Sequence, residues 1–375
     1  MTASRYCCWT RRSSRPRLGD PVLDDTLLDD PGRLADADTG GWLRAAARAG
    51  AQVRSTAEAA AEAGVERIFS ERPRAVVLVT RPGHAVAVAD VVMALLGPGC
   101  SVPVVVSDEV PPWVGALDVV LAHTEDPGDR VLAESIDRAC RRGARTLLTA
   151  PDSGPVAAAA AGQAVLLAPR VDVPPGFSFH RALAAWLVVL NSLGLLKVDV
   201  DLIADELDRE AERDHPMHES FVNPAKSLAL RVADRTPLLW GLDEVATSVG
   251  VHGAGVLAAF AGVASDVAAY PQALTRPVLH RRAVQGTSGA DLFADPDDEP
   301  GGGLLRVLLL AVRQGPVADA VRHAAEDALP GADVLEPAVE VAGGDAVSAA
   351  LLALRFELAA LYLGLAAGTL GGNPY

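Results

Sequence analysis

The sequence predicts an α/β protein in which short parallel strands alternate with helices in two successive lobes. Short apolar runs such as residues 75–79 are each followed by a loop and a stretch of helical periodicity. This pattern is typical of strands buried on both faces of a doubly wound parallel sheet. The same alternation returns after residue 226, and 375 residues with 50% hydrophobic composition are enough for two cores.

The first lobe is expected to open with a long helix over residues 41–70, where apolar and Ala positions recur at helical spacing. Its strands are expected at residues 75–79, 102–106, 117–122, 144–149 and 164–167. Its further helices are expected at residues 85–96, 129–142, 177–193 and 202–213. A small-molecule site is expected in the crevice where such strands end.

The charged, Pro-containing segment 210–216 is the expected linker between the lobes. In the second lobe we expect helices at residues 226–233, 245–262, 317–328 and 346–370, and strands at 237–240, 304–312 and 333–341. The aperiodic acidic run 291–299 predicts an exposed loop, which could close over the crevice. The predicted domains are a disordered tail (1–26), an N-terminal domain with the leading helix (27–214) and a C-terminal domain (215–375).

Charge and cysteine content exclude several classes of protein. The net charge of −15 and the pI of 4.9 would repel phosphate backbones, so a nucleic-acid partner is not expected. The four cysteines show neither metal-site spacing nor a secreted disulfide framework, which predicts no metal and a reducing cytoplasm. The first residues lack the apolar core of a signal peptide, and the apolar stretch 351–370 contains Arg355 and Glu357, so it predicts a buried helix and no membrane span.

Two consecutive motifs carry a family resemblance: Asn223-Pro-Ala-Lys-Ser-Leu-Ala229 on a predicted helix and Pro237-Leu-Leu-Trp-Gly241 on the next strand. With them the chain resembles the double sugar-isomerase (SIS) proteins, and in particular the bifunctional phosphoglucose/phosphomannose isomerases. Further local matches are Arg142-Gly-Ala144, Arg181-Ala-Leu183 and Tyr362-Leu-Gly-Leu365. Residues 28–31 and 49–54 look most like the divergent TobH-like branch. The resemblance implies two flavodoxin-like SIS domains, a sugar-phosphate ligand, no cofactor and a homodimer.

The family's two phosphate-binding loops are altered in this sequence. The first, a Gly-Gly-Ser type in the family, corresponds to residues 80–84, and the second, a Ser-rich type, to residues 122–128. Hydroxyl and amide donors at a helix N-terminus hold an anion, whereas Glu125 and Asp126 would repel one. The resemblance and these loops nominate a set of substrate-binding residues: Thr80, Arg81, His84, His123, Thr124, Arg181 and Lys226.

Each of these residues also has an ordinary structural interpretation. Arg81 and His84 could be solvated at a helix start, and His123 could be a simple loop residue. Arg181 could form a helix-surface salt bridge, and Lys226 could serve helix packing. His215 and His218 have the spacing of a metal pair, but Pro216 breaks the helix that would align them, which favours a linker.

The family's catalytic glutamate is absent. The matching region holds residues 251–255 and 270–274, and His252 is the one candidate base. A core histidine is the alternative, since Gly253-Ala-Gly255 offers no partner to orient the imidazole. Aldose–ketose isomerisation would then depend on His252 or on an unrecognised carboxylate.

Two functions follow and stay open, because a fold does not fix a function. The first is a phosphosugar-binding SIS protein resembling glucose-6-phosphate/mannose-6-phosphate isomerase, with an eroded active site, whose residues 215–375 form a C-terminal SIS-like isomerase domain. The second is a non-catalytic sugar-phosphate sensor or scaffold protein. Whether the chain is an enzyme, and which sugar phosphate it takes, are not decided by the sequence.

Overall fold

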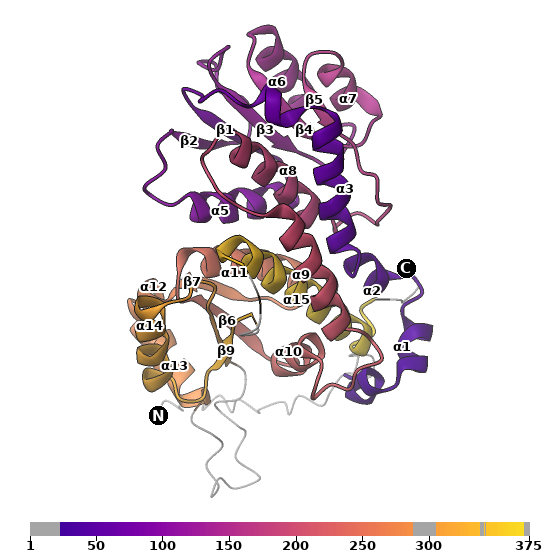
Figure 1. Cartoon of the computed structure of the whole chain (residues 1–375). Coiled ribbons are helices and arrows are strands. Elements are labelled where there is room, and N and C mark those ends of the chain that lie inside the picture. The colour runs from indigo at the N-terminus through magenta and orange to yellow at the C-terminus, as the bar shows by residue number, and fades with distance from the viewer. Residues whose placement is uncertain (1–22, 288–304, 338–340, 342, 371–375) are drawn as a thin grey trace, which may run out of the picture.

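The computed structural model describes residues 23–287, 305–337, 341 and 343–370. In this structure the chain forms two lobes, each built around a parallel β-sheet (Figure 1). The α/β class and the two doubly wound sheets predicted from the sequence are confirmed.

The first sheet has the strand order β2-β1-β3-β4-β5, and all neighbouring strands are parallel. Its strands are β1 (Val76–Thr80), β2 (Val104–Ser107), β3 (Val119–His123), β4 (Arg145–Thr149) and β5 (Val165–Leu167). After β2 the chain crosses to the other side of β1 to form β3. The topological switch point, where ligands bind in open α/β sheets, therefore lies between β1 and β3.

The helices between residues 25 and 213 cover both faces of this sheet, except for the first three, which lie against the second lobe (Figure 1). They are η1 (Asp25–Asp29), α1 (Pro31–Ala37), α2 (Trp42–Ala46), α3 (Ala49–Glu62), α4 (Val65–Ile68), α5 (His84–Leu96), α6 (Arg130–Arg141), α7 (Gly154–Ala160), α8 (Phe179–Ser192) and α9 (Val200–Arg213). The single leading helix predicted over residues 41–70 is divided into α2, α3 and α4. Gly64 adopts φ 71° between α3 and α4, a left-handed conformation that ends a helix.

The second sheet is also parallel, in the order β7-β6-β8-β9. Its strands are β6 (Thr236–Gly241), β7 (Asp266–Ala269), β8 (Leu305–Leu310) and β9 (Asp333–Leu335). Its helices are α10 (Pro224–Val232), α11 (Glu244–Val256), the π-helical turn η2 (Leu257–Ala261), α12 (Tyr270–Leu274), α13 (Pro277–Thr287), α14 (Pro316–Ala328) and α15 (Asp345–Ala366). Strand β7 was not predicted, and β9 is shorter than the predicted strand 333–341. The acidic run 291–299 lies outside the described residues.

The segment expected to be a linker, residues 210–216, begins inside a helix. Helix α9 continues to Arg213, and Glu210 is fully buried against α15. The end of the predicted tail is also ordered, since the Asp24 amide donates to the Ala366 carbonyl. The interpretation of residues 210–216 as a linker is therefore wrong for its first four residues, which belong to α9, while the predicted domain limits stay predictions.

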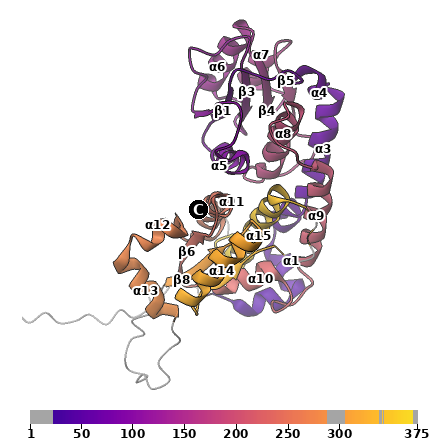
Figure 2. The same ribbon diagram turned by 60° about the vertical axis from the view of Figure 1, so that its left-hand side comes forward.

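The two lobes share one hydrophobic core. The main apolar cluster contains residues of both sheets, such as Leu78 and Leu308, and extends along α15. Smaller clusters fill the outer face of each sheet. Helix α5 of the first lobe packs on α11 of the second, as Figure 2 shows, and α11 in turn packs on α15.

Two helical segments, Glu244–Ala261 and Asp345–Ala366, are long and apolar enough to cross a membrane by length and composition. The most apolar 18-residue stretch of Asp345–Ala366 is entirely buried inside the structure, and half of the residues in Glu244–Ala261 are buried. Burial by protein explains the apolar character of α15, as the sequence predicted for this stretch.

The close approach of α11 to α15 gives a testable prediction. A Cβ on Gly253 would lie 2.8 Å from Phe356 Cγ, so we expect Gly253→Ala to lower the free energy of unfolding by about 1–3 kcal/mol. Gly255→Ala is the matched control, because a Cβ there meets no atom within 4 Å and should stabilise the helix by about 0.5–1 kcal/mol. Urea denaturation measures both, and equal effects would contradict the packing.

Candidate functional site

The candidate site lies at the carboxyl end of the first sheet. The parallel register sets Thr80, His123 and Thr149 side by side at the last positions of β1, β3 and β4. The loops that follow β1 and β3 flank the topological switch point. The sheet therefore places the two altered phosphate loops next to each other, where a ligand is expected.

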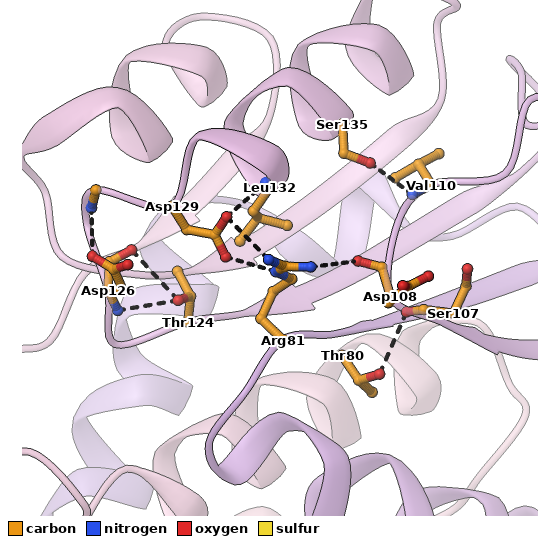
Figure 3. A network of polar contacts seen from close by, with 11 residues as sticks. Thr80, Arg81, Ser107, Asp108, Val110, Thr124, Asp126, Asp129, Leu132 and Ser135 are labelled. Carbon is orange, nitrogen blue, oxygen red and sulfur yellow. Dashed lines mark hydrogen bonds and ion pairs between the residues drawn. The ribbon is translucent and has the colours of Figure 1, made fainter.

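Carboxylates of the protein itself occupy the second loop (Figure 3). Asp129 caps α6 by accepting from the Leu132 amide at 3.0 Å, and it accepts from Arg81 Nε at 2.6 Å. Asp126 accepts from the Gly128 amide at 2.8 Å. The donors that would hold a phosphate at the start of α6 are thus used internally, and Arg81 is neutralised by Asp129.

The first loop leaves the start of α5 uncapped. Gly83, at the N-cap position, has no side chain that could accept from the first-turn amides, and it adopts φ 115°, a conformation that L side chains rarely adopt. His84 is the first residue of the helix and is half-buried. Burial and the neighbouring His252 lower the pKa of His84. The amides of α5 are therefore open to an anion.

His123 is a buried structural bridge between β3, β4 and the start of α8. Its Nδ1 lies 2.8 Å from Thr149 Oγ1 and its Nε2 lies 2.9 Å from Ser178 Oγ. Burial, followed by the charge of Arg181, lowers the pKa of His123 well below its usual value. The imidazole is therefore neutral and has both nitrogens hydrogen-bonded.

Arg181 is the least satisfied cation of the site. The residue is 8% exposed, and its Nη1 has no hydrogen-bond partner among the described residues. Burial lowers its pKa and Glu125 opposes this shift. Glu125 Oε1 in turn accepts from the Gly176 amide at 3.1 Å, which ties the second loop to the segment before α8.

A cluster of buried polar groups lies where the lobes meet. The ring centroid of His252 on α11 lies 4.0 Å from the ring centroid of Phe179 and 5.5 Å from that of His84. His252 Nε2 is 3.0 Å from Glu357 Oε1 on α15. Burial lowers the pKa of His252 to about 3 and raises the pKa of Glu357. A neutral imidazole this weakly basic is a poor proton acceptor near neutral pH.

The structure brings four predicted residues together and separates one. His84, His123, Arg181 and His252 converge at the lobe interface, while Thr80 ends β1 and Arg81 and Thr124 lie in the flanking loops. Thr80 Oγ1 donates to the Ser107 carbonyl at 3.4 Å, and Thr124 Oγ1 accepts from the Asp126 amide at 3.1 Å.

Lys226 lies away from this cluster. Its Nζ donates to the carbonyls of Leu28, Pro216 and His218 at 2.5, 2.7 and 2.6 Å, and the residue is fully buried. All three N–H donors are used, so none is left for a phosphate. Helix packing, the second interpretation of Lys226, is what the geometry supports, and its nomination as a ligand residue is corrected.

Glu357 is the residue that sequence reasoning missed. It is the carboxylate partner of His252, although no orienting group was found near His252 in the sequence. The available signal was a lone glutamate in the otherwise mostly apolar stretch 351–370. Among the described residues, no group of three or more His, Cys, Asp or Glu could hold a metal ion, and His215 is exposed.

Comparison with known proteins identifies the fold. No family model and no curated protein matches the chain. The C-terminal domain of glucosamine-fructose-6-phosphate aminotransferase from Francisella tularensis is similar in structure, with a TM-score of 0.58 at 12% identity over 89% of this chain and 98% of that domain. Tagatose-6-phosphate ketose/aldose isomerase from Escherichia coli has a TM-score of 0.61 at 11% identity, covering 88% and 94%.

A hypothetical protein from Thermus thermophilus is similar as well, with a TM-score of 0.62 at 15% identity over 91% of this chain and 89% of that protein. These likenesses together show a fold of two tandem SIS domains, the class predicted from the sequence.

Proposed function

We propose that the chain is a phosphosugar-binding SIS protein of the TobH-like branch that binds glucose 6-phosphate or mannose 6-phosphate without isomerising it. The observation that carries this proposal is the buried guanidinium of Arg181, whose Nη1 has no partner among the described residues. A buried nitrogen of a charged group that lacks a hydrogen-bond partner costs about 1–3 kcal/mol or more, and an anionic ligand that accepts from Nη1 would offset that cost. The SIS fold and the phosphosugar enzymes that share it support a sugar phosphate as that anion.

The loss of isomerase chemistry is supported by the state of the base. Moving a proton between C1 and C2 of a sugar needs a basic group in contact with the substrate. His252 is 2% exposed and its pKa is lowered to about 3, and Glu357 is 1% exposed. Because His252 and Glu357 are both buried, the geometry favours a non-catalytic sensor or scaffold over an isomerase.

A thermal-shift titration tests the binding. We expect glucose 6-phosphate or mannose 6-phosphate to raise the melting temperature by mass action, and the unphosphorylated sugars to leave it unchanged. Arg181→Met should abolish the shift without lowering the ligand-free melting temperature, because it removes a buried charge that has little to bind. Arg170→Met, which removes an exposed ion pair with Glu62, is the control and should keep the shift.

Proton exchange at C2 in deuterated water separates binding from catalysis. Binding without exchange would support the sensor. Binding with exchange would show a working isomerase and would contradict the proposal that His252 cannot act as the base. The absence of any shift would contradict the sugar-phosphate proposal itself.

We further propose that the protein is a cytoplasmic homodimer. Exposed apolar side chains on α13 and α14, Val278 (61%) and Val317 (81%), are available for contact with a second copy. Light scattering would test the oligomeric state.

A further inference from the structure

The buried contacts of Glu357 define a three-residue bridge between the lobes. One carboxylate oxygen, Oε1, lies 3.0 Å from His252 Nε2, and the other, Oε2, lies 3.7 Å from His180 Nδ1. All three residues are 2% exposed or less. His180 belongs to α8 of the first lobe, while His252 and Glu357 belong to α11 and α15 of the second. We call these three residues the interlobe triad.

Hydrogen-bond geometry fixes the tautomer of His180. Its Nε2 lies 3.0 Å from the Ala350 carbonyl, which can only accept, so Nε2 carries the hydrogen. In the neutral ring Nδ1 is then an acceptor, and it has no partner among the described residues. It faces Glu357 Oε2, which as an ionised carboxylate would also be an acceptor. Two acceptor atoms would face each other unless a proton lies between them.

A proton on Glu357 resolves this conflict. The neutral acid can donate from Oε2 toward His180 Nδ1 while Oε1 accepts from His252 Nε2–H. The gap of 3.7 Å is longer than a hydrogen bond, and a movement of about 1 Å closes it. The alternative, an imidazolium beside a carboxylate, would bury two charges at a site with almost no solvent contact. Besides the two imidazoles of the triad, the titratable groups near Glu357 are His84, the first residue of α5, and Glu125, in the loop after β3.

The triad lies next to the proposed anion-binding residue. His180 is the second residue of α8 and Arg181 is the third, so a bond that fixes His180 also fixes the backbone that carries Arg181. We propose that Glu357 is held as a neutral carboxylic acid that donates to His180, and that it thereby acts as a positioning residue for Arg181. The positioning role rests on the proposed function, whereas the protonation of Glu357 does not depend on it.

Infrared difference spectra of wild type and Glu357→Gln, with 13C-labelled glutamate, test the neutral acid directly. At pH 7 the wild type should show one protonated carboxyl group that the variant lacks. Burial raises the pKa of Glu357, so this signal should disappear only when the pH rises through that raised pKa. An ionised carboxylate at pH 7 would overturn the assignment.

Two variants of the same position test the role. Glu357→Gln copies the neutral acid, since its amide can donate to His180 and its carbonyl can accept from His252, and it should melt within about 2 °C of wild type. Glu357→Leu leaves both imidazoles unpaired and should melt several degrees lower. For glucose 6-phosphate, the affinity of Glu357→Gln should stay within about threefold of wild type and that of Glu357→Leu should fall by about tenfold or more.

The pH profile distinguishes positioning from general destabilisation. Wild-type affinity should fall as Glu357 ionises at alkaline pH, and Glu357→Gln should lack this decrease. Equal affinities and profiles in all three proteins would overturn the positioning role. If the wild type binds no sugar phosphate, the proposed function and the positioning role both fail, while the infrared result still decides the protonation of Glu357.

Discussion

Replacing Arg355 by alanine is expected to lower the free energy of unfolding by about 3 kcal/mol. Arg355 on α15 donates to Glu210 on α9 through Nε at 2.8 Å and Nη2 at 2.7 Å, and Glu210 is fully buried. Removing the guanidinium leaves the carboxylate with Arg213 as its remaining ion pair, at 2.8 Å. A buried charge that loses its main partner is strongly destabilising, whereas an exposed pair contributes little.

Two controls separate the charge effect from general damage to the helix. Arg54→Ala removes two ion pairs, with Asp205 and Asp208, whose arginine side chain is 41% exposed, and it should cost about 1 kcal/mol or less. The double variant Arg355→Met/Glu210→Met removes both charges and should recover most of the loss. Urea denaturation at pH 7 gives all three values. A loss below about 1 kcal/mol for Arg355→Ala would show that this ion pair does not hold α9 to α15.

The fold could be predicted because most of its strands are short apolar runs, which can be recognised without knowing their tertiary contacts. Residues 75–79 are a continuous apolar run and residues 304–312 are apolar except for Arg306, and each run forms an interior parallel strand close to the predicted place. Strand β7 escaped prediction because Asp266–Ala269 is four residues long and begins with an aspartate. The end of α9 was predicted at its observed place, but residues 210–216 were interpreted as a linker because they are charged and contain a proline. The burial of Glu210 against α15 is a tertiary contact that no local pattern reveals.

The site was predictable only in its parts. His84, His123 and Arg181 follow strands or start helices, positions that the sequence marks, and the parallel register brings those positions to one edge. The partner of His252 could not be read from the sequence, because 105 residues separate it from Glu357 and the contact depends on how two helices of the second lobe pack. For Lys226, the sequence motif was compatible with both ligand binding and packing, and only the three carbonyl contacts decide between them.

Asp214 is expected to make stability fall as the pH rises from about 4 to about 7. Burial, with Glu210 nearby, raises the pKa of Asp214 to about 7, while its value in the unfolded chain is near 3.9. Below both values the group is protonated in both states and its contribution is complete. Between them only the folded state holds the proton, so each pH unit costs about 1.4 kcal/mol, or roughly 4 kcal/mol in all, and above about 7 the loss is complete.

Asp214→Asn should remove most of this slope and be the more stable protein at pH 8. The substitution keeps the acceptor, Oδ1, that binds the Ala225 amide at 2.8 Å, and it cannot ionise. Asp201→Asn is the control, because Asp201 is exposed near the start of α9, the helix that Asp214 follows, and this variant should keep the wild-type slope. Unfolding free energies measured from pH 4 to pH 8 check both, and a parallel slope in Asp214→Asn would exclude Asp214 as its source. In Arg355→Ala the decline should extend to higher pH, because Arg355 lowers the pKa of Asp214.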